Sequence, residues 1–311
     1  MKWKTFSIVI PTYNRPEYVG EMLRLLCEQY DPPEFEVIIV NDGGDEKALT
    51  EMYAQFKQYA QYEHRLLLTR FFHQANSGAA AARNLGASKA LGEIVVFLDD
   101  DCHPDQYWLF ALKRHYQQYP NCMVGGPMEI SPLVYDNLSS VASQLFIRFL
   151  HEIFTDVKGG APYRTKICGG HNMAVSRRLF YEVGQYDRRL NLTAGDDREL
   201  WDRWLAAGYE IHYDPSVVVY HRHVMSPKRI WLQFRRYGRG AYQFSKIVAE
   251  NGRHESPFNT LGFQMESVLY PFACYIQPWS RQFKLACLIA MLQVAYFFGV
   301  VEEIGRSKRG L

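Results

Sequence analysis

Blocks of apolar residues alternate with amphipathic segments along most of the chain. Short apolar runs that stop at polar residues are typical of buried strands, and such runs occupy 6–10, 35–40 and 94–98. A weaker strand is expected to begin near residue 66. Apolar residues at helical spacing predict helices over 17–29, 48–61 and 79–91. Strands that alternate with helices form βαβ units, so the pattern predicts an α/β fold with a mostly parallel sheet flanked by helices.

The pattern is less regular between about residues 100 and 225. Helices are expected over 108–119, 177–183 and 195–207, and strands over 123–127, 209–213 and 217–220. The stretch 136–155 is apolar and aromatic at irregular helical spacing. It is compatible with a mobile flap over a site and equally with a packed helix.

Polar residues follow three of the predicted strands. These ends are Thr12-Tyr13-Asn14-Arg15, Asn41-Asp42 and Asp99-Asp100-Asp101. The carboxyl ends of parallel strands meet at one edge of the sheet, where open α/β folds bind their ligands. Three adjacent carboxylates repel one another and need a counter-charge. A hard divalent cation that holds a phosphate group accounts for them, and so does an acidic strand end in a solvated loop.

Composition narrows the class of protein. The chain has 311 residues, of which 48% are hydrophobic and 22% charged, and its net charge of +2 does not indicate a nucleic-acid partner. The six cysteines are scattered without a Cys-x-x-Cys pair, which argues against a zinc knuckle and a disulfide framework and favours the reducing cytosol. The motifs of P-loop NTPases and Rossmann dehydrogenases are missing from the first strand and its loop.

Two glycine-containing segments have the character of ligand-binding loops. Gly78 allows close backbone approach at a helix start, and Arg83 on that helix is a phosphate or carboxylate partner or is simply solvated. Gly169 and Gly170 precede the polar pair His171-Asn172, which suits a backbone that lies against a ligand.

Further acids and a histidine are candidates for catalysis and metal binding. Asp196 and Asp197 begin a helix, where they act as caps or, in the case of Asp197, as a general base. His221 ends a strand of a sheet that already has three acids at its edge, so it is a candidate metal ligand.

Taken together, six motifs in this order resemble those of family 2 glycosyltransferases with the GT-A fold. The motifs are Ile8-Val9-Ile10-Pro11-Thr12-Tyr13-Asn14-Arg15, Val40-Asn41-Asp42-Gly43, Asn76-Ser77-Gly78 to Ala82-Arg83-Asn84, Phe97-Leu98-Asp99-Asp100-Asp101, Gly169-Gly170-His171-Asn172-Met173 and Gly195-Asp196-Asp197-Arg198-Glu199-Leu200. The resemblance implies a GT-A catalytic domain with a Rossmann-like sheet over residues 1–225. A helical, aromatic-rich extension would follow over 226–311.

The resemblance implies a role for each matching residue. The donor nucleotide would be bound by Pro11, Tyr13, Arg15, Asp42, Arg83, Asp99 and Asp100, with Asp42 on the base and Asp99 at the ribose. The metal would be held by Asp101, with Asp99 and His221 as further ligands. The acceptor would meet Gly169, Gly170, His171, Asn172 and Asp196, and Asp197 matches the catalytic carboxylate. Many relatives have Glu in place of Asp196.

These roles predict a metal-dependent, inverting hexosyltransferase. Mn²⁺ or Mg²⁺ would neutralise the nucleoside diphosphate as it leaves, while Asp197 takes the proton of the acceptor hydroxyl. The resemblance makes a UDP-sugar the expected donor and a cell-surface polysaccharide or glycolipid the expected product.

Two other functions are compatible with parts of this pattern. A sugar-1-phosphate nucleotidyltransferase has the same type of fold but begins with a Gly-rich, Arg-containing loop, where this chain has Pro11-Thr12-Tyr13-Asn14. A glycan- or nucleotide-binding module without catalysis is the other alternative, and the acids at 99, 101 and 197 argue against it.

The last quarter of the chain has a different character. Residues 226–250 interleave aromatic and basic side chains, which suits a helix at a membrane surface or one packed on the catalytic domain. Residues 285–301 are almost continuously apolar and match a short transmembrane helix, an interfacial helix or a buried helix in a dimer. We expect peripheral or C-terminally anchored association with the cytoplasmic face of a membrane, and a glycan or lipid-linked acceptor. A homo-oligomer is possible.

Overall fold

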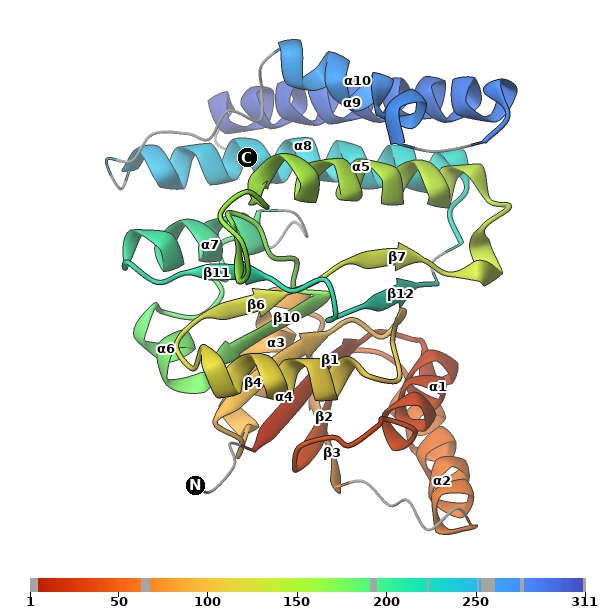
Figure 1. The fold of residues 1–311 in the computed structure, drawn as a ribbon, viewed down its shortest axis with the longest axis vertical. Coiled ribbons are helices and arrows are strands. Elements are labelled where there is room, and N and C mark those ends of the chain that lie inside the picture. The colour runs from red at the N-terminus through yellow and green to blue at the C-terminus, as the bar shows by residue number, and fades with distance from the viewer. Residues whose placement is uncertain are drawn as a thin grey trace.

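The computed structural model describes residues 5–62, 68–190, 195–222, 224–250, 252, 261–274 and 277–309. Figure 1 shows a central sheet with helices on both of its faces and a layer of long helices on one side of this unit. The described part of the chain starts in this sheet and ends in the helical layer.

The main sheet is mixed, with its N-terminal strands in parallel. In the described part of the chain its nine strands have the order β3-β2-β1-β4-β10-β6-β11-β9-β8. The first four of these pair in parallel, whereas β10 lies antiparallel between β4 and β6. The strands are β1 (Phe6–Thr12), β2 (Phe35–Asp42), β3 (Leu68–Gln74), β4 (Ile94–Leu98), β6 (Met123–Gly125), β8 (Thr155–Asp156), β9 (Tyr163–Thr165), β10 (Asn172–Ser176) and β11 (Ile211–Tyr213).

A smaller sheet continues the edge where β4 ends. Its strands are β5 (Cys102–Pro104), β12 (Val219–His221) and β7 (Met128–Ile130), with β12 in the middle. His221 pairs with Cys102 in this sheet, so the strand that ends in His221 is placed directly beside the acidic end of β4.

Alternate residues of the central strands enter two separate cores. Ile8, Val37 and Val96 pack under α1 (Pro16–Cys27), α2 (Glu46–Tyr62) and α4 (Trp108–Gln118). Their neighbours pack on the other face under α3 (Ala79–Lys89), α6 (Arg177–Glu182) and α7 (Asp196–Ala206). Helix α3 lies so close to the sheet that a Cβ at Gly86 would be 2.2 Å from a methyl of Val9, which accounts for glycine there.

The helical layer joins the C-terminal helices to one helix from the earlier part of the chain. It contains α5 (Leu138–Phe154), α8 (Pro227–Glu250), α9 (Leu261–Cys274) and α10 (Trp279–Lys308) (Figure 1). Leu145 and Phe149 of α5 share a core with Leu285 and Ile289 of α10. The predicted extension from residue 226 is therefore packed against the predicted catalytic domain rather than separate from it.

The structure also resolves the segments that the sequence left open. Residues 138–154 form the packed helix α5, so the stretch 136–155 is not a flap in this structure. The apolar run 285–301 lies inside the longer helix α10. The third strand is described from Leu68, and residues 66 and 67 lie outside the described residues.

Candidate active site

A cavity of about 1080 Å³ opens at the carboxyl ends of β1 and β4 and extends to the helical layer. Most of the predicted donor, metal and catalytic residues line it, namely Pro11, Tyr13, Arg15, Asp42, Arg83, Asp99, Asp100, Asp101, His171, Asp196 and Asp197. The helical side of the cavity includes Phe146, Arg229, Phe234, Arg236, Tyr237 and Phe263. Gly169, Gly170, Asn172 and His221 are absent from the lining in the described part of the chain.

Arg15 supplies the counter-charge for the acids at the end of β4. Its Nη1 lies 2.9 Å from Asp100 Oδ1 and 2.9 Å from Asp101 Oδ2. Asp100 is also bonded by the hydroxyl of Thr12 at 2.7 Å. Burial and the adjacent Asp101 nevertheless raise the pKa of Asp100 to about 7. The guanidinium of Arg15 is therefore the counter-charge that the repulsion between these carboxylates requires.

Asp101 and His221 are close enough to share a divalent cation. His221 Nε2 is 3.6 Å from Asp101 Oδ1, and the sulfur of Cys102 completes a group whose ligand atoms lie within 4.8 Å of one another. Carboxylate oxygen and imidazole nitrogen are ligands that Mn²⁺ accepts, so these residues fit the implied metal. Gln144 of α5 lies 2.6 Å from His221 Nδ1 and orients the ring.

Asp99 and Asp196 are both bound to the buried Arg83. Arg83 Nη2 is 2.7 Å from Asp99 Oδ1, and Nη1 is 3.4 Å from Asp196 Oδ2. The facing carboxylates raise the pKa of Arg83, so this side chain remains charged inside the protein. In this geometry Asp99 faces Arg83 rather than the Asp101–His221 pair, which does not favour its predicted role as a metal ligand.

Asp197 is held at the cavity by two hydrogen bonds. The backbone N–H of Gly170 donates to its Oδ2 at 3.1 Å, and the Tyr186 hydroxyl donates to its Oδ1 at 3.2 Å. Burial raises the pKa of the Asp197 carboxyl, and Arg83 opposes that shift. A Cβ at position 170 would lie 2.7 Å from Asp197 Oδ1, so this contact requires glycine. A buried carboxylate with a raised pKa is suited to act as a general base.

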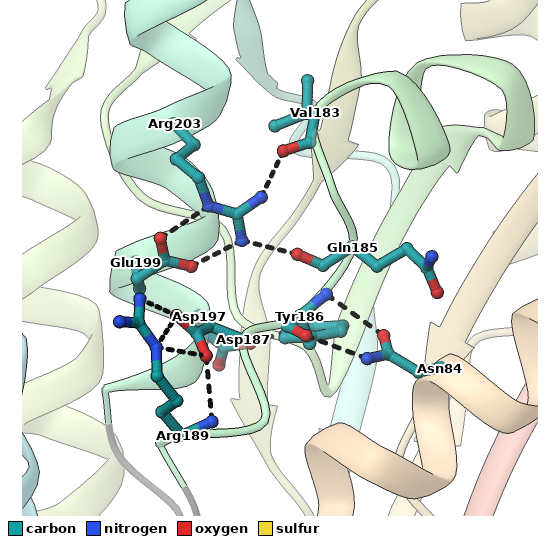
Figure 2. Close-up of polar contacts among 9 residues, drawn as sticks. All are labelled: Asn84, Val183, Gln185, Tyr186, Asp187, Arg189, Asp197, Glu199 and Arg203. Carbon is teal, nitrogen blue, oxygen red and sulfur yellow. Dashed lines mark hydrogen bonds and ion pairs between the residues drawn. The ribbon is translucent and has the colours of Figure 1, made fainter. Parts of the chain in front are cut away.

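The loop before α7 is locked in place by Arg203 (Figure 2). Arg203 pairs with Glu199 one turn earlier and donates to the carbonyl oxygens of Val183 and Gln185. The backbone of Tyr186 is held at both ends by the Asn84 side chain, at 2.9 and 3.1 Å. Helix α3 thus fixes the loop that carries Tyr186, and through it the position of Asp197 (Figure 2).

Two predicted site residues have structural partners instead of free side chains. Asp42 lines the cavity, but its carboxylate accepts from the backbone of Ser77 and Gly78 at 2.8 and 2.9 Å. The Asn172 side chain is buried, accepts from Trp108 Nε1 at 2.9 Å and donates to the Val217 carbonyl at 2.8 Å. The side chain of Asn172 therefore has a structural role at the start of β10, and its acceptor contact stays a prediction.

Gly169, Gly170 and His171 form one turn beside Asp197. A Cβ at Gly169 would lie 2.1 Å from the His171 ring, so glycine is needed for the ring to fold back over the backbone. His171 lines the cavity, and burial lowers its pKa to about 4, so it is neutral at ordinary pH. Its predicted place near the acceptor is compatible with this position.

Other side chains at the site carry no motif in the sequence. Tyr186 and Gln144 contact Asp197 and His221, yet each is a single residue without a recognisable spacing. The helical side of the cavity was equally unforeseen, because it depends on how α5, α8 and α9 pack.

Known proteins with similar sequences are glycosyltransferases. The model of the family "Glycosyl transferase family 2" matches residues 7–184. Glycosyltransferase AglE of Haloferax volcanii is 27% identical over 76% of this chain and 73% of its own length. Chondroitin synthase of Pasteurella multocida is 26% identical over 70% of this chain but only 24% of its own length.

Solved structures with the same fold are also glycosyltransferases. The Pyrobaculum calidifontis mannosyltransferase PcManGT, in complex with GDP-Man and Mn²⁺, has a TM-score of 0.63 and 18% identity, covering 98% of this chain and 88% of that one. GalNAc-T7 with UDP, GalNAc and Mn²⁺ has a TM-score of 0.57 and 17% identity, covering 85% of this chain and 54% of that one. The chain therefore belongs to glycosyl transferase family 2 and is a glycosyltransferase with the GT-A fold.

Proposed function

We propose that this glycosyltransferase moves a sugar from a nucleoside-diphosphate donor to an acceptor hydroxyl, with a divalent cation and with inversion at the anomeric carbon. The observation that carries the proposal is the position of Asp197. Its half-buried carboxylate lines the same cavity as the Asp99–Asp101 edge, and Gly170 and Tyr186 hold it in place. A single displacement with inversion requires one general base and no carboxylate that acts as a nucleophile.

The donor diphosphate would lie at the strand ends of β1 and β4. Asp101 and His221 would hold Mn²⁺ or Mg²⁺, which when bound neutralises the departing diphosphate. Arg15 contacts the same carboxylate at 2.9 Å, so it would exchange Asp101 for the diphosphate when the donor enters. Tyr13, exposed at the rim of the cavity, would cover the nucleobase of the donor.

Asp197 would accept the proton of the attacking hydroxyl. Its raised pKa brings proton affinity closer to that of the acceptor oxygen than an exposed aspartate would have. Asp196 is committed to Arg83 and is the less suitable of the two neighbouring acids for this step. This assignment agrees with the resemblance, which placed the base at Asp197 and Asp196 near the acceptor.

A UDP-sugar remains the proposed donor. The two structural neighbours contain GDP-Man in one case and UDP with GalNAc in the other, so they support a nucleotide-sugar donor without choosing the base. Asp42, the residue predicted to bind the base, is occupied by Ser77 and Gly78. The nucleobase would then be recognised mainly by stacking and by hydrogen bonds to backbone groups.

The acceptor would be a lipid-linked glycan entering from the helical side. Phe146, Phe234 and Phe263 give that wall an apolar surface. The exposed Arg229 and Arg236 add positive charge to it, and the structure records no ion pair for either with the other residues it describes. Apolar walls next to cations suit a molecule with a hydrocarbon chain and an anionic head group.

Membrane association would follow from the exposed face of α10. Among the described residues, α10 is the one helix with the length and composition to cross a bilayer. Its exposed large apolar side chains share one face at helical spacing, and these are Trp279, Phe283, Val294, Phe297, Phe298 and Val301. Lys284 and the basic residues 306, 308 and 309 border this face and would attract anionic lipid at the cytoplasmic leaflet.

The packing of α10 favours a helix that lies in the membrane surface over one that spans it. Its other face contacts α8 through the Arg239–Glu303 pair at 2.7 Å. Gly238 and Gly299 let the two backbones touch, since a Cβ at either would lie 1.9 Å from the facing carbonyl oxygen. A helix bound along its length to an aqueous domain cannot be surrounded by lipid, so we place α10 flat at the interface.

Donor turnover by the Asp197→Asn variant tests the mechanism. With Mn²⁺ and a membrane lipid extract as acceptor source, release of nucleoside diphosphate should fall about 10²- to 10⁴-fold relative to wild type. Nucleotide binding should persist, because Asn keeps the size of the side chain. The exposed Asp136 provides a matched control, and Asp136→Asn should turn over normally. Equal release by Asp197→Asn and wild type would remove Asp197 as the base.

A further inference from the structure

A second group of metal-ligating side chains lies away from the active-site cavity. His115 in α4, Cys122 in the next loop and His212 in β11 have exposed fractions of only 6%, 3% and 1%. Their ligand atoms lie within 4.8 Å of one another. Strand β6 runs parallel to β4, since both pair antiparallel with β10. Cys122, directly before β6, therefore lies at the end of the sheet opposite the carboxylates of the active site.

The two imidazoles form the middle of a chain of hydrogen bonds. Asp214 Oδ2 is 2.9 Å from His115 Nδ1, and His115 Nε2 is 3.0 Å from His212 Nδ1. At the far end, His212 Nε2 is 3.0 Å from Glu210 Oε2, and Arg164 pairs with the same carboxylate at 2.7 Å. Each imidazole thus has one nitrogen on a carboxylate and the other facing its partner.

The contact between the two imidazoles, in the middle of this chain of hydrogen bonds, lacks a proton. Its three contacts need three protons, whereas two neutral imidazoles carry two. Asp214 also accepts hydrogen bonds from the backbone N–H and the hydroxyl of Ser216, and Glu210 pairs with Arg164, so both carboxylates are placed as acceptors for the imidazoles. The missing positive charge between the two rings must come from an extra proton or from a metal ion.

We propose that His115, Cys122 and His212 bind a Zn²⁺ ion as a structural site. Two imidazoles that each donate their outer N–H to a carboxylate, with their inner nitrogens facing one point, have the arrangement found around protein-bound zinc. Cys122 adds the soft sulfur ligand that distinguishes a zinc site from a histidine pair. The carbonyl oxygen of Tyr119 accepts from the Cys122 thiol at 3.2 Å, and a water or this carbonyl would complete the coordination.

The distances require only small movements of these side chains. Tetrahedral zinc with bonds of about 2.0 Å to nitrogen and 2.3 Å to sulfur separates its ligand atoms by about 3.3 to 3.7 Å. The ring nitrogens, 3.0 Å apart, would open by a few tenths of an ångström. The sulfur lies within 4.8 Å of both nitrogens, so it would move by at most about 1.3 Å.

Zinc binding would release two protons and leave the charge of the site unchanged. One proton leaves the gap between the imidazoles and the other leaves the Cys122 thiol, while Zn²⁺ brings two positive charges. The apparent affinity should therefore fall about 100-fold for each unit that the pH is lowered, wherever both groups are protonated in the free protein. Bound zinc would join α4, the loop after it and β11, which are distant in sequence.

Cobalt spectroscopy of the full chain tests this site. The Asp101→Ala variant is used as the background so that the active site does not contribute. Co²⁺ should bind once per chain and give a thiolate-to-cobalt charge-transfer band with tetrahedral visible bands. Cys122→Ser in this background should abolish the charge-transfer band, and Cys287→Ser, at an exposed cysteine, should keep it. A band that is absent, or that survives Cys122→Ser, overturns the proposal.

The metal content of the Asp101→Ala protein, in which the active site does not contribute, provides a second measurement that needs no cobalt. After removal of metal and incubation with equimolar Zn²⁺ at pH 7.5, elemental analysis should find one zinc per chain retained through gel filtration. The melting temperature should rise with it. Less than a tenth of an equivalent retained, with no rise, means that a proton occupies the gap between the imidazoles and rejects the zinc site.

Discussion

Asp100 shows the effect of placing three carboxylates at one edge of the sheet. Its carboxyl is buried beside Asp101, which raises its pKa to about 7, whereas in the unfolded chain it would titrate near 4. The folded state therefore binds more protons than the unfolded state between these two values. The resulting stabilisation is present at pH 4 and is lost as the pH rises through about 7.

Replacing Asp100 by Asn should remove this dependence. In metal-free protein, the stability of Asp100→Asn relative to wild type should increase from pH 4 to pH 8, by at most about 4 kcal/mol. The variant keeps an oxygen for Arg15, which is 2.9 Å away. Urea unfolding at several pH values in the presence of EDTA measures the difference. A difference that does not change with pH would mean that Asp100 is ionised throughout.

Tyr186 gives a prediction about the pKa of Asp197. Its hydroxyl donates to Asp197 at 3.2 Å and lowers the pKa of that carboxyl. Tyr186→Phe removes the hydroxyl and keeps the ring beside Arg83, so the pKa of Asp197 should rise further. The acidic limb of the pH profile of kcat/KM should then move to higher pH. An unchanged limb, with Tyr181→Phe as the surface control, would contradict the contact.

The sequence predicted site residues well where the backbone alone brings them together. Arg15, Asp99, Asp101 and Asp197 meet because parallel strands and a helix start deliver them to one edge. The burial of the Asn172 side chain was not foreseen, because the alternation of side chains decides which way it points and no pattern reveals that at the first residue of a strand. Tyr186 was missed because its position depends on the Asn84 contact from a helix more than a hundred residues earlier.

The crossing of α8 and α10 gives a prediction at the level of the helix pair. At Gly299 a Cβ would lie 1.9 Å from the Arg235 carbonyl oxygen, whereas at Gly305 it would meet nothing within 4 Å. Gly299→Ala should therefore lower the melting temperature by forcing the helices apart. Gly305→Ala, on the same helix, should raise stability by up to about 1 kcal/mol through helix propensity. Thermal unfolding of both variants decides, and equal effects would argue against a close crossing.

The elements were easier to predict in type than in extent. Apolar runs predicted β1, β2 and β4, since a strand buried on both faces is apolar along most of its length, with Ser7 and Glu36 as buried polar exceptions. Helix α10 extends well beyond its 17-residue apolar run, because its ends are stabilised by contacts such as Arg235–Glu302 and Arg239–Glu303 rather than by apolar residues. Packing of α5 into the helical layer had no local signal of its own.

The whole molecule should bind anionic membranes through the exposed face of α10. Phe297→Asp together with Val301→Asp removes two of its exposed apolar side chains, one turn apart, and adds negative charge. Phe298 is kept, because its ring packs 6.1 Å from the ring of Trp231 in α8. The variant should lose flotation with phosphatidylglycerol vesicles while keeping its melting temperature, because both replaced side chains are largely exposed. Leu133→Asp and Val157→Asp, at exposed positions elsewhere, should float like wild type.

Extraction distinguishes a helix in the membrane surface from one that spans the bilayer. Alkaline carbonate should release the wild-type protein from vesicles, as expected for a surface helix. Resistance to carbonate would indicate a span, and no binding to any vesicle with a dimer in solution would assign the α10 face to a second copy of the chain.

The central claim is that the cavity at the carboxyl ends of β1 and β4 binds a nucleoside diphosphate through a cation at Asp101. Its most direct test is thermal stabilisation of the full chain by UDP, GDP, dTDP and CDP, each with and without Mn²⁺, beside Asp101→Ala. At a hundred times its Kd, a nucleotide should add about 2.7 kcal/mol of stability. The account predicts a shift with one nucleotide that requires Mn²⁺ and is lost in Asp101→Ala. A shift that is independent of Mn²⁺, or equal in the variant, would contradict it.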